Sequence, residues 1–111
     1  MILLGKQFYT ILELDKEFAL NLTDTLERST LELLLKLDVS ISNADIQTSK
    51  DILHTIKGGC ANYGAEKMTS TSKFIEDKIT YLDKSNINDF KQLANQLHQE
   101  LLQTLDAARN A

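Results

Sequence analysis

The sequence contains no proline and only four glycines among its 111 residues, and cysteine occurs once. A β-sandwich or barrel of this length would need turn-forming residues every few positions, so the scarcity of proline and glycine excludes both. Long segments without helix breakers, rich in leucine, lysine, glutamate and glutamine, favour helices instead. The lone Cys60 excludes an internal disulfide and a multi-cysteine zinc site, and it is typical of a reducing compartment.

Charge and hydropathy narrow the class of protein further. No stretch approaches the ~20 apolar residues of a membrane span, and the apolar opening at residues 1–4 is too short for a signal peptide. The 12 lysines and arginines against 16 aspartates and glutamates give a net charge of −4, which argues against a nucleic-acid binder. Because 42% of the residues are hydrophobic, the chain can bury one core. We expect a single domain over residues 1–111, in the cytoplasm and not in a membrane.

Apolar residues recur at intervals of three and four, which places them on one face of a helix. This spacing predicts long helices over about residues 16–37, 43–62, 65–82 and 87–108, and a short helix within the first fifteen residues. The inward positions that we expect are Ala19, Leu22, Leu26, Leu33 and Leu37, then Ile46, Leu53, Ile56 and Cys60, then Ala65, Met68, Ser72, Ile75, Ile79 and Leu82, and finally Ile87, Phe90, Leu93, Ala94, Leu97, Leu101, Leu105 and Ala108.

Polar and glycine-containing segments predict where these helices end. Residues 38–43 are a polar break, and Ser42 with Asp45 has the spacing of a capping box that starts the next helix. Gly64 is placed to close that helix, and the polar run 83–86 provides the last turn. Helices of about 18–22 residues with short loops pack as antiparallel neighbours. The sequence therefore predicts an all-α fold, an up-down-up-down antiparallel four-helix bundle with a short extra N-terminal helix across one end.

Candidate chemistry lies in the second long helix, around His54. At about 100° per residue, His54 turns away from Leu53 and Ile56 and projects from the polar face. An exposed neutral imidazole is a competent nucleophile, and Lys57 lies one turn further on, where its ammonium would stabilise an anion. Two adjacent glycines begin at Gly58, each costing a helix about 1 kcal/mol relative to alanine. Close approach of another molecule would compensate, so this pattern indicates a carrier of a phosphoryl group.

One segment resembles the signature of histidine-containing phosphotransfer (HPt) domains, the modules of multistep two-component phosphorelays: HTIKGGCANYGA, residues 54–65. The resemblance implies that His54 accepts the phosphoryl group on Nε2 and that Lys57 stabilises the transferred phosphate. It also implies that Gly58 leaves room for the partner. By the same resemblance, Glu76 on the next helix hydrogen-bonds the histidine, and Lys73 is a further candidate for positive charge at the site.

The same resemblance implies the partners. A phosphoryl group would pass reversibly between His54 and receiver-domain aspartates, from a hybrid histidine kinase to a response regulator. Mg²⁺ would belong to the receiver's acidic pocket, and we expect no cofactor or metal site in the chain itself. With no Walker-type loop or nucleotide lid, the chain is expected to be a phosphocarrier and not an enzyme. We expect a monomer, because the face that bears His54 must stay open.

Simpler interpretations stay open for several residues. Glu76 would equally pair with Lys73 or Thr80 on its own helix face. Gly59 is expected to turn toward the core, where it would allow a tight helix crossing. His98, beside the apolar stripe of the last helix, is expected to be a boundary histidine and not a second phosphorylation site, and Cys60 an inert buried thiol.

Two other classes of protein share features with this sequence. Asp51 and His54 have the i, i+3 spacing of di-iron bundles, but such sites need two inward-facing motifs with further glutamates. A plain interaction module would bind a receiver without transferring phosphate. Only a carrier would gain a phosphate that the substitution His54→Gln abolishes.

Overall fold

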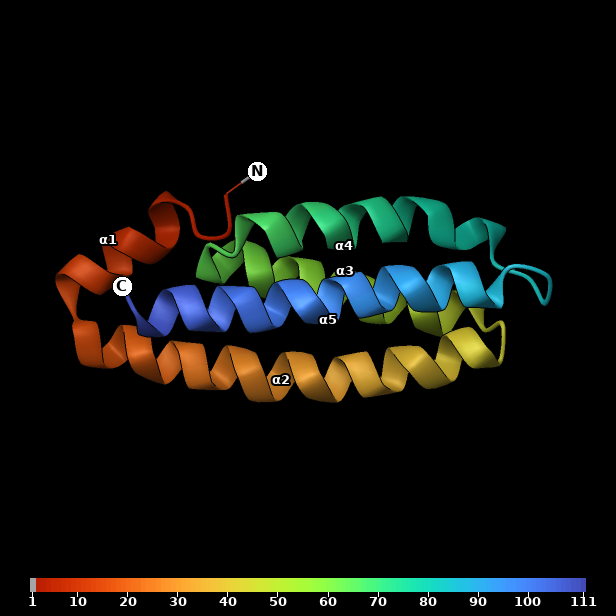
Figure 1. The fold of residues 1–111 in the computed structure, drawn as a ribbon, viewed down its shortest axis with the longest axis horizontal. Coiled ribbons are helices and arrows are strands. Elements are labelled where there is room, and N and C mark those ends of the chain that lie inside the picture. Colours follow the sequence, from red (N-terminus) through yellow and green to blue (C-terminus); the bar gives the residue numbers. More distant parts are fainter. Residues whose placement is uncertain (1) are drawn as a thin grey trace.

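The computed structural model describes residues 2–111, which form a bundle of antiparallel helices about 47 Å long (Figure 1). Its elements are α1 (Lys6–Leu14), α2 (Lys16–Ser42), α3 (Ile46–Tyr63), α4 (Glu66–Lys78), the 3₁₀ turn η1 (Ile79–Tyr81) and α5 (Ile87–Arg109). Helices α2 to α5 alternate in direction, and α1 lies across the end at which α2 begins and α5 finishes. The predicted all-α, up-down-up-down bundle with a short N-terminal helix is confirmed.

The helix lengths differ from the predicted 18–22 residues, because α2 has 27 residues and α4 only 13 before it tightens into η1. Most of the predicted inward positions are buried, but five are only partly buried: Leu22, Leu33, Ile46, Ile87 and Leu93. The core also includes Leu34 of α2 and Ile52 of α3, which were not predicted. Its fully buried large side chains include Phe8, Leu37, Ile41, Leu53, Ile56, Met68, Ile75, Ile79, Leu97 and Leu101. Within residues 2–111, none of the helices combines the length and apolarity needed to cross a bilayer.

The predicted break at residues 38–43 is wrong, since α2 continues to Ser42. Two residues of this stretch, Ser40 and Ile41, are buried and extend the inner face of the helix by a further turn. The hydroxyl of Ser40 lies 2.7 Å from that of Ser49 on α3, so each buried polar group satisfies the other. Local polarity predicted a loop, but contacts across the two helices stabilise a longer helix.

The start of α3 also differs from the predicted capping box. The cap is Asp45, whose carboxylate accepts a hydrogen bond from the Thr48 amide at 3.1 Å, and the helix begins at Ile46. Ser42 does not cap α3, because its hydroxyl donates to the Asp38 carbonyl oxygen within α2. An aspartate at this position supplies an acceptor to an otherwise unpaired amide of the first turn.

The corner between α3 and α4 behaves as predicted. Helix α3 ends at Tyr63, and Gly64 follows with φ +98°, a left-handed conformation that glycine adopts without strain. A Cβ at Gly64 would lie 2.6 Å from the backbone nitrogen of Phe8, so α1 also needs a glycine there. An isolated antiparallel bridge between Leu4 and Ala65 fastens the N-terminal segment to the same corner. This corner sets the register of α4 against α3 and therefore positions the site.

Candidate functional site

Helix α3 presents His54 to solvent, as its helical spacing predicts. The side chain is 72% exposed, while its neighbours Leu53 and Ile56 are buried in the core. One nitrogen of the ring is nevertheless held, because Nδ1 lies 3.1 Å from Oε2 of Glu76 on α4. The histidine is therefore exposed to a second molecule while its ring orientation is fixed.

Glu76 joins His54 to Lys57. Its second oxygen, Oε1, accepts a hydrogen bond from Lys57 Nζ at 2.6 Å, and its side chain is only 12% exposed. Burial acts to raise the pKa of Glu76, but the hydrogen bonds from Lys57 and His54 outweigh burial and hold the pKa below its ordinary value. The carboxylate is therefore ionised at neutral pH and links two basic side chains.

This geometry defines the tautomer of the neutral imidazole. An ionised carboxylate only accepts hydrogen bonds, so the nitrogen that faces Glu76 must carry the ring proton. Nδ1 of His54 is then the donor, and Nε2 keeps its lone pair. The exposed nitrogen of the ring is thus the nucleophilic one.

A polar pocket of about 480 Å³ surrounds the ring, lined by Gln47, Lys50, Asp51, His54, Thr55 and Glu76. Asp51 accepts a hydrogen bond from Gln47 at 2.8 Å within α3. Lys50 stands one turn before His54 and adds a cation to the wall. Lys50 and His54 are four residues apart and therefore share a face of α3. The contribution of Lys50 to a pocket also depends on the neighbouring helix, for which the sequence carries no signal.

The two helical glycines leave open space. A Cβ built at Gly58 or Gly59 would meet no neighbouring atom within 4 Å, so no packing contact requires either glycine. The tight helix crossing expected at Gly59 is therefore wrong. Gly59 is exposed and borders a groove between α2 and α3 instead, because α2 does not approach this turn of α3 closely.

Two further residues have other surroundings. Lys73 donates to Asp77 at 2.9 Å, four residues along its own helix, so it makes no direct pair with Glu76. The hydrogen bond and charge of Asp77, and more weakly the charge of Glu76, raise the pKa of Lys73, which leaves its charge near the site. Cys60 is fully buried, and burial raises the pKa of its thiol to about 12, which makes it unreactive.

A di-iron centre does not fit these residues. Asp51 and His54 are both exposed on the outer face of α3, whereas such a centre needs carboxylates and histidines that converge inside the bundle. In the part of the chain that the structure describes, no group of three or more histidine, cysteine, aspartate or glutamate residues is placed to hold a metal ion.

Comparison with known families assigns the chain. The family model described as "Hpt domain" matches residues 21–111, a region that includes nearly all of α2 and the whole of α3, α4 and α5. The chain therefore belongs to the Hpt domain family, the histidine phosphotransfer modules of phosphorelays, which work with receiver domains. Such a domain is a phosphocarrier and not a catalytic domain. No curated protein and no solved structure gives a significant match.

Proposed function

We propose that His54 is the phosphorylated residue and that it relays a phosphoryl group from the receiver domain of a hybrid histidine kinase to a response regulator. The observation that carries this proposal is the hydrogen bond from Nδ1 to the partly buried Glu76, which leaves Nε2 of the exposed ring free. In the step we propose, the Nε2 lone pair attacks the phosphorus of an aspartyl phosphate. The bond from phosphorus to the aspartyl oxygen breaks, and the aspartate leaves as a carboxylate.

Glu76 is proposed to act through the ring and not on the phosphate. When Nε2 bonds to phosphorus, the imidazole gains positive charge while Nδ1 keeps its proton. The ionised carboxylate 3.1 Å away stabilises that charge and holds the ring in place. Transfer to the response regulator reverses these steps, because its aspartate displaces Nε2 from phosphorus.

Lys57 is proposed to turn from Glu76 toward the transferred phosphoryl group. It lies one turn beyond His54, its side chain is only 27% exposed, and its Nζ lies 2.6 Å from Oε1 of Glu76, which also holds His54. A lysine is a compact charge on a flexible stem, so it can exchange one anionic partner for another. Any Mg²⁺ in the reaction would be supplied by the acidic pocket of the receiver.

The receiver is proposed to dock over the bare turn at Gly58 and the adjoining groove between α2 and α3. This groove, of about 340 Å³, is lined mainly by apolar and small residues, among them Leu22, Leu26, Leu33 and Gly59. Because the turn at Gly58 offers no side chain, a partner backbone can approach the ring closely. The open face is expected to keep the protein monomeric, and its one reduced cysteine suits the cytoplasm.

The test is phosphotransfer from a receiver domain charged with acetyl phosphate, comparing the wild type with His54→Gln. His98→Gln is the matched control, since it removes the other histidine of the chain. Phosphate should move to the wild type and to the control but not to His54→Gln, in a linkage labile to acid and stable to base. If the wild type binds the receiver but gains no phosphate, the protein is an interaction module and not a carrier.

A further inference from the structure

Two buried side-chain oxygens among residues 2–111 have no hydrogen-bond partner, Ser72 Oγ and Glu100 Oε1. The missing partner costs more free energy at Glu100 than at Ser72, because Glu100 is a carboxylate on α5 with only 3% of its surface exposed. Its other oxygen, Oε2, accepts a single hydrogen bond from Gln96 at 3.0 Å. A donor that reached Oε1, above all a cationic one, would satisfy this group.

Glu100 borders a pocket of about 280 Å³ between α4 and α5. The other lining residues are Lys67, Ser70, Thr71, Phe74 and Gln96. The ring of Phe74 is half exposed and already attracts a cation, since Lys78 Nζ lies 5.8 Å from its centroid. The pocket thus offers a carboxylate, an aromatic face and two hydroxyl groups able to accept hydrogen bonds.

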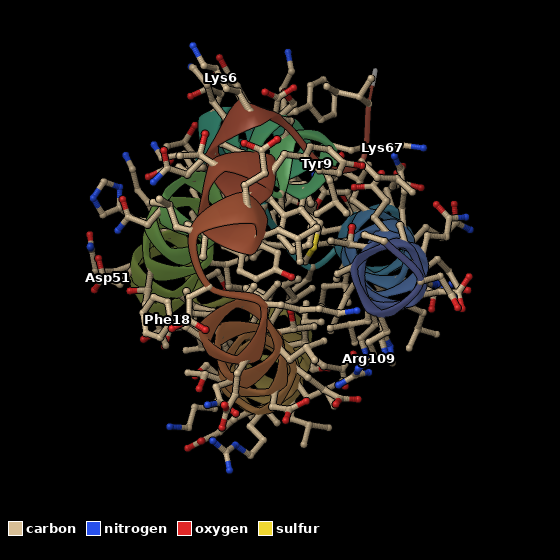
Figure 2. All side chains as sticks on the ribbon, turned by 90° about the vertical axis from the view of Figure 1, so that its left-hand side faces the viewer. Lys6, Tyr9, Phe18, Asp51, Lys67 and Arg109 are labelled. Atoms are coloured by element: carbon tan, nitrogen blue, oxygen red, sulfur yellow. The ribbon has the colours of Figure 1, made fainter. Side chains whose placement is uncertain are left out.

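The pocket is separate from the site at His54. Its α4 residues share one face of the helix, and Glu76 lies on roughly the opposite face of the same helix at about 100° per residue. Figure 2 shows Lys67 and Asp51 on opposite sides of the bundle. A ligand in the pocket would therefore leave the face of His54 open.

We infer that this pocket binds a guanidinium group, with Glu100 as its anionic partner and Phe74 as its stacking surface. Guanidinium is planar, stacks on aromatic rings and is more weakly hydrated than an ammonium group, so it loses less on entering a partly buried pocket. The hydroxyls of Ser70 and Thr71 accept from its remaining N–H groups. Such a group arrives either on an arginine of a partner protein or on a small guanidinium compound.

Lys67 is the competitor within the chain. It is half-buried in the same pocket, its charge repels an incoming cation, and Oε1 is shielded from solvent. The ligand therefore reaches Glu100 by displacing the flexible Lys67 side chain. Removing that ammonium without shortening the side chain much, as in Lys67→Met, should tighten binding.

The test is an NMR titration of the full chain, followed through its backbone amides, at constant ionic strength. The probes are methylguanidinium, methylammonium and the blocked tripeptide acetyl-Gly-Arg-Gly-amide. Methylguanidinium should shift amides of the α4–α5 pocket at lower concentration than methylammonium. The tripeptide binding more tightly than methylguanidinium identifies a protein side chain as the source, and equal binding identifies a small compound. Absence of shifts in the pocket with both guanidinium probes overturns the inference.

Substitutions decide whether Glu100 is the partner. Glu100→Gln should weaken methylguanidinium binding roughly tenfold, and Lys67→Met should tighten it, while His54→Gln should leave it unchanged. Should Glu100→Gln fail to fold, which circular dichroism would reveal, Phe74→Ala on the pocket rim should still weaken binding. Equal affinity in the wild type and in a folded Glu100→Gln, or in Phe74→Ala, contradicts the assignment.

Discussion

The chain has two histidines, His54 on α3 and His98 on α5. Their surroundings differ at every position that matters for chemistry. Three and four residues after His54 come Lys57 and Gly58, whereas the same offsets from His98 hold two leucines, the buried Leu101 and the half-exposed Leu102. The ring of His54 is bound to a carboxylate from another helix. Among the residues that the structure describes, no hydrogen bond or ion pair holds the ring of His98, which lies half-buried in a groove between α2 and α5.

This difference shows which surroundings would favour a surface histidine as a nucleophile. The imidazole itself is the same in both places. What His54 adds is a fixed tautomer, a cation within one turn and a bare approach at Gly58. Each addition can be removed, or given a counterpart at His98, so the comparison can be tested one element at a time.

The largest effect is expected from removing the rings themselves. His54→Gln should abolish phosphotransfer, because the other histidine, His98, has no carboxylate that orients its ring among residues 2–111. His98→Gln should retain the full rate. The incorporation of labelled phosphate from a phosphorylated receiver measures transfer to both variants. Labelling of His54→Gln would mean that another residue accepts the phosphoryl group.

The second largest effect on the transfer rate is expected from a side chain at Gly58, which would block the approach of the receiver to His54. Gly58→Leu should fold normally, because a Cβ at Gly58 meets no atom within 4 Å, yet it should slow transfer roughly a hundredfold by displacing the receiver. The matched change at the other histidine, Leu102→Gly, should leave transfer untouched and lower helix stability by about 1 kcal/mol. Transfer rates and thermal unfolding of the two variants test this prediction. A normal rate in Gly58→Leu would mean that the receiver docks elsewhere.

Weakening the contact between Glu76 and the His54 ring should slow phosphotransfer less. Glu76→Gln keeps the shape of the side chain but removes the charge that stabilises the imidazole, so we expect transfer to slow about tenfold. Glu76→Asp, which restores a carboxylate on a shorter stem, should recover part of the loss. The rate of transfer under single-turnover conditions is the measurement. An unchanged rate in Glu76→Gln would make the contact at 3.1 Å incidental to transfer.

The smallest effect is on stability. The pKa of Glu76 is lower in the folded protein than its ordinary value of 4.5. Its contacts therefore add stability that is present above that pH and is lost as the pH falls through the folded pKa. Urea unfolding at about pH 6 and about pH 3 should show a loss in the wild type that is smaller in Glu76→Gln. Equal losses in both proteins would contradict the predicted linkage.

Much of this arrangement could be predicted from the sequence, because it depends on periodicity within one helix. The exposure of His54, the burial of Leu53 and Ile56 and the closure at Gly64 all follow from local spacing. The open surroundings of Gly59 were not predictable, since they depend on how closely α2 approaches α3.

Contacts between helices account for the other features that could not be predicted from the sequence. The extra turn of α2 is stabilised by the hydroxyl pair of Ser40 and Ser49. This pair joins two helices, so no local sequence pattern predicts it. That Glu76 accepts from both His54 and Lys57 depends on the register of α4 against α3. A resemblance to a known family pointed to Glu76, but spacing along a single helix could not have done so.

In the proposed relay, Glu76 holds His54 so that Nε2 is the phosphorylated atom. The most direct measurement is NMR of the imidazole nitrogens, recorded with ¹⁵N-labelled protein before and after phosphorylation by a charged receiver. The structure predicts a proton on Nδ1 of the neutral His54 ring beforehand and a phosphorus–nitrogen bond at Nε2 of His54 afterwards. A proton on Nε2 of the neutral ring, or a phosphoryl group on Nδ1 or on His98, would contradict the claim.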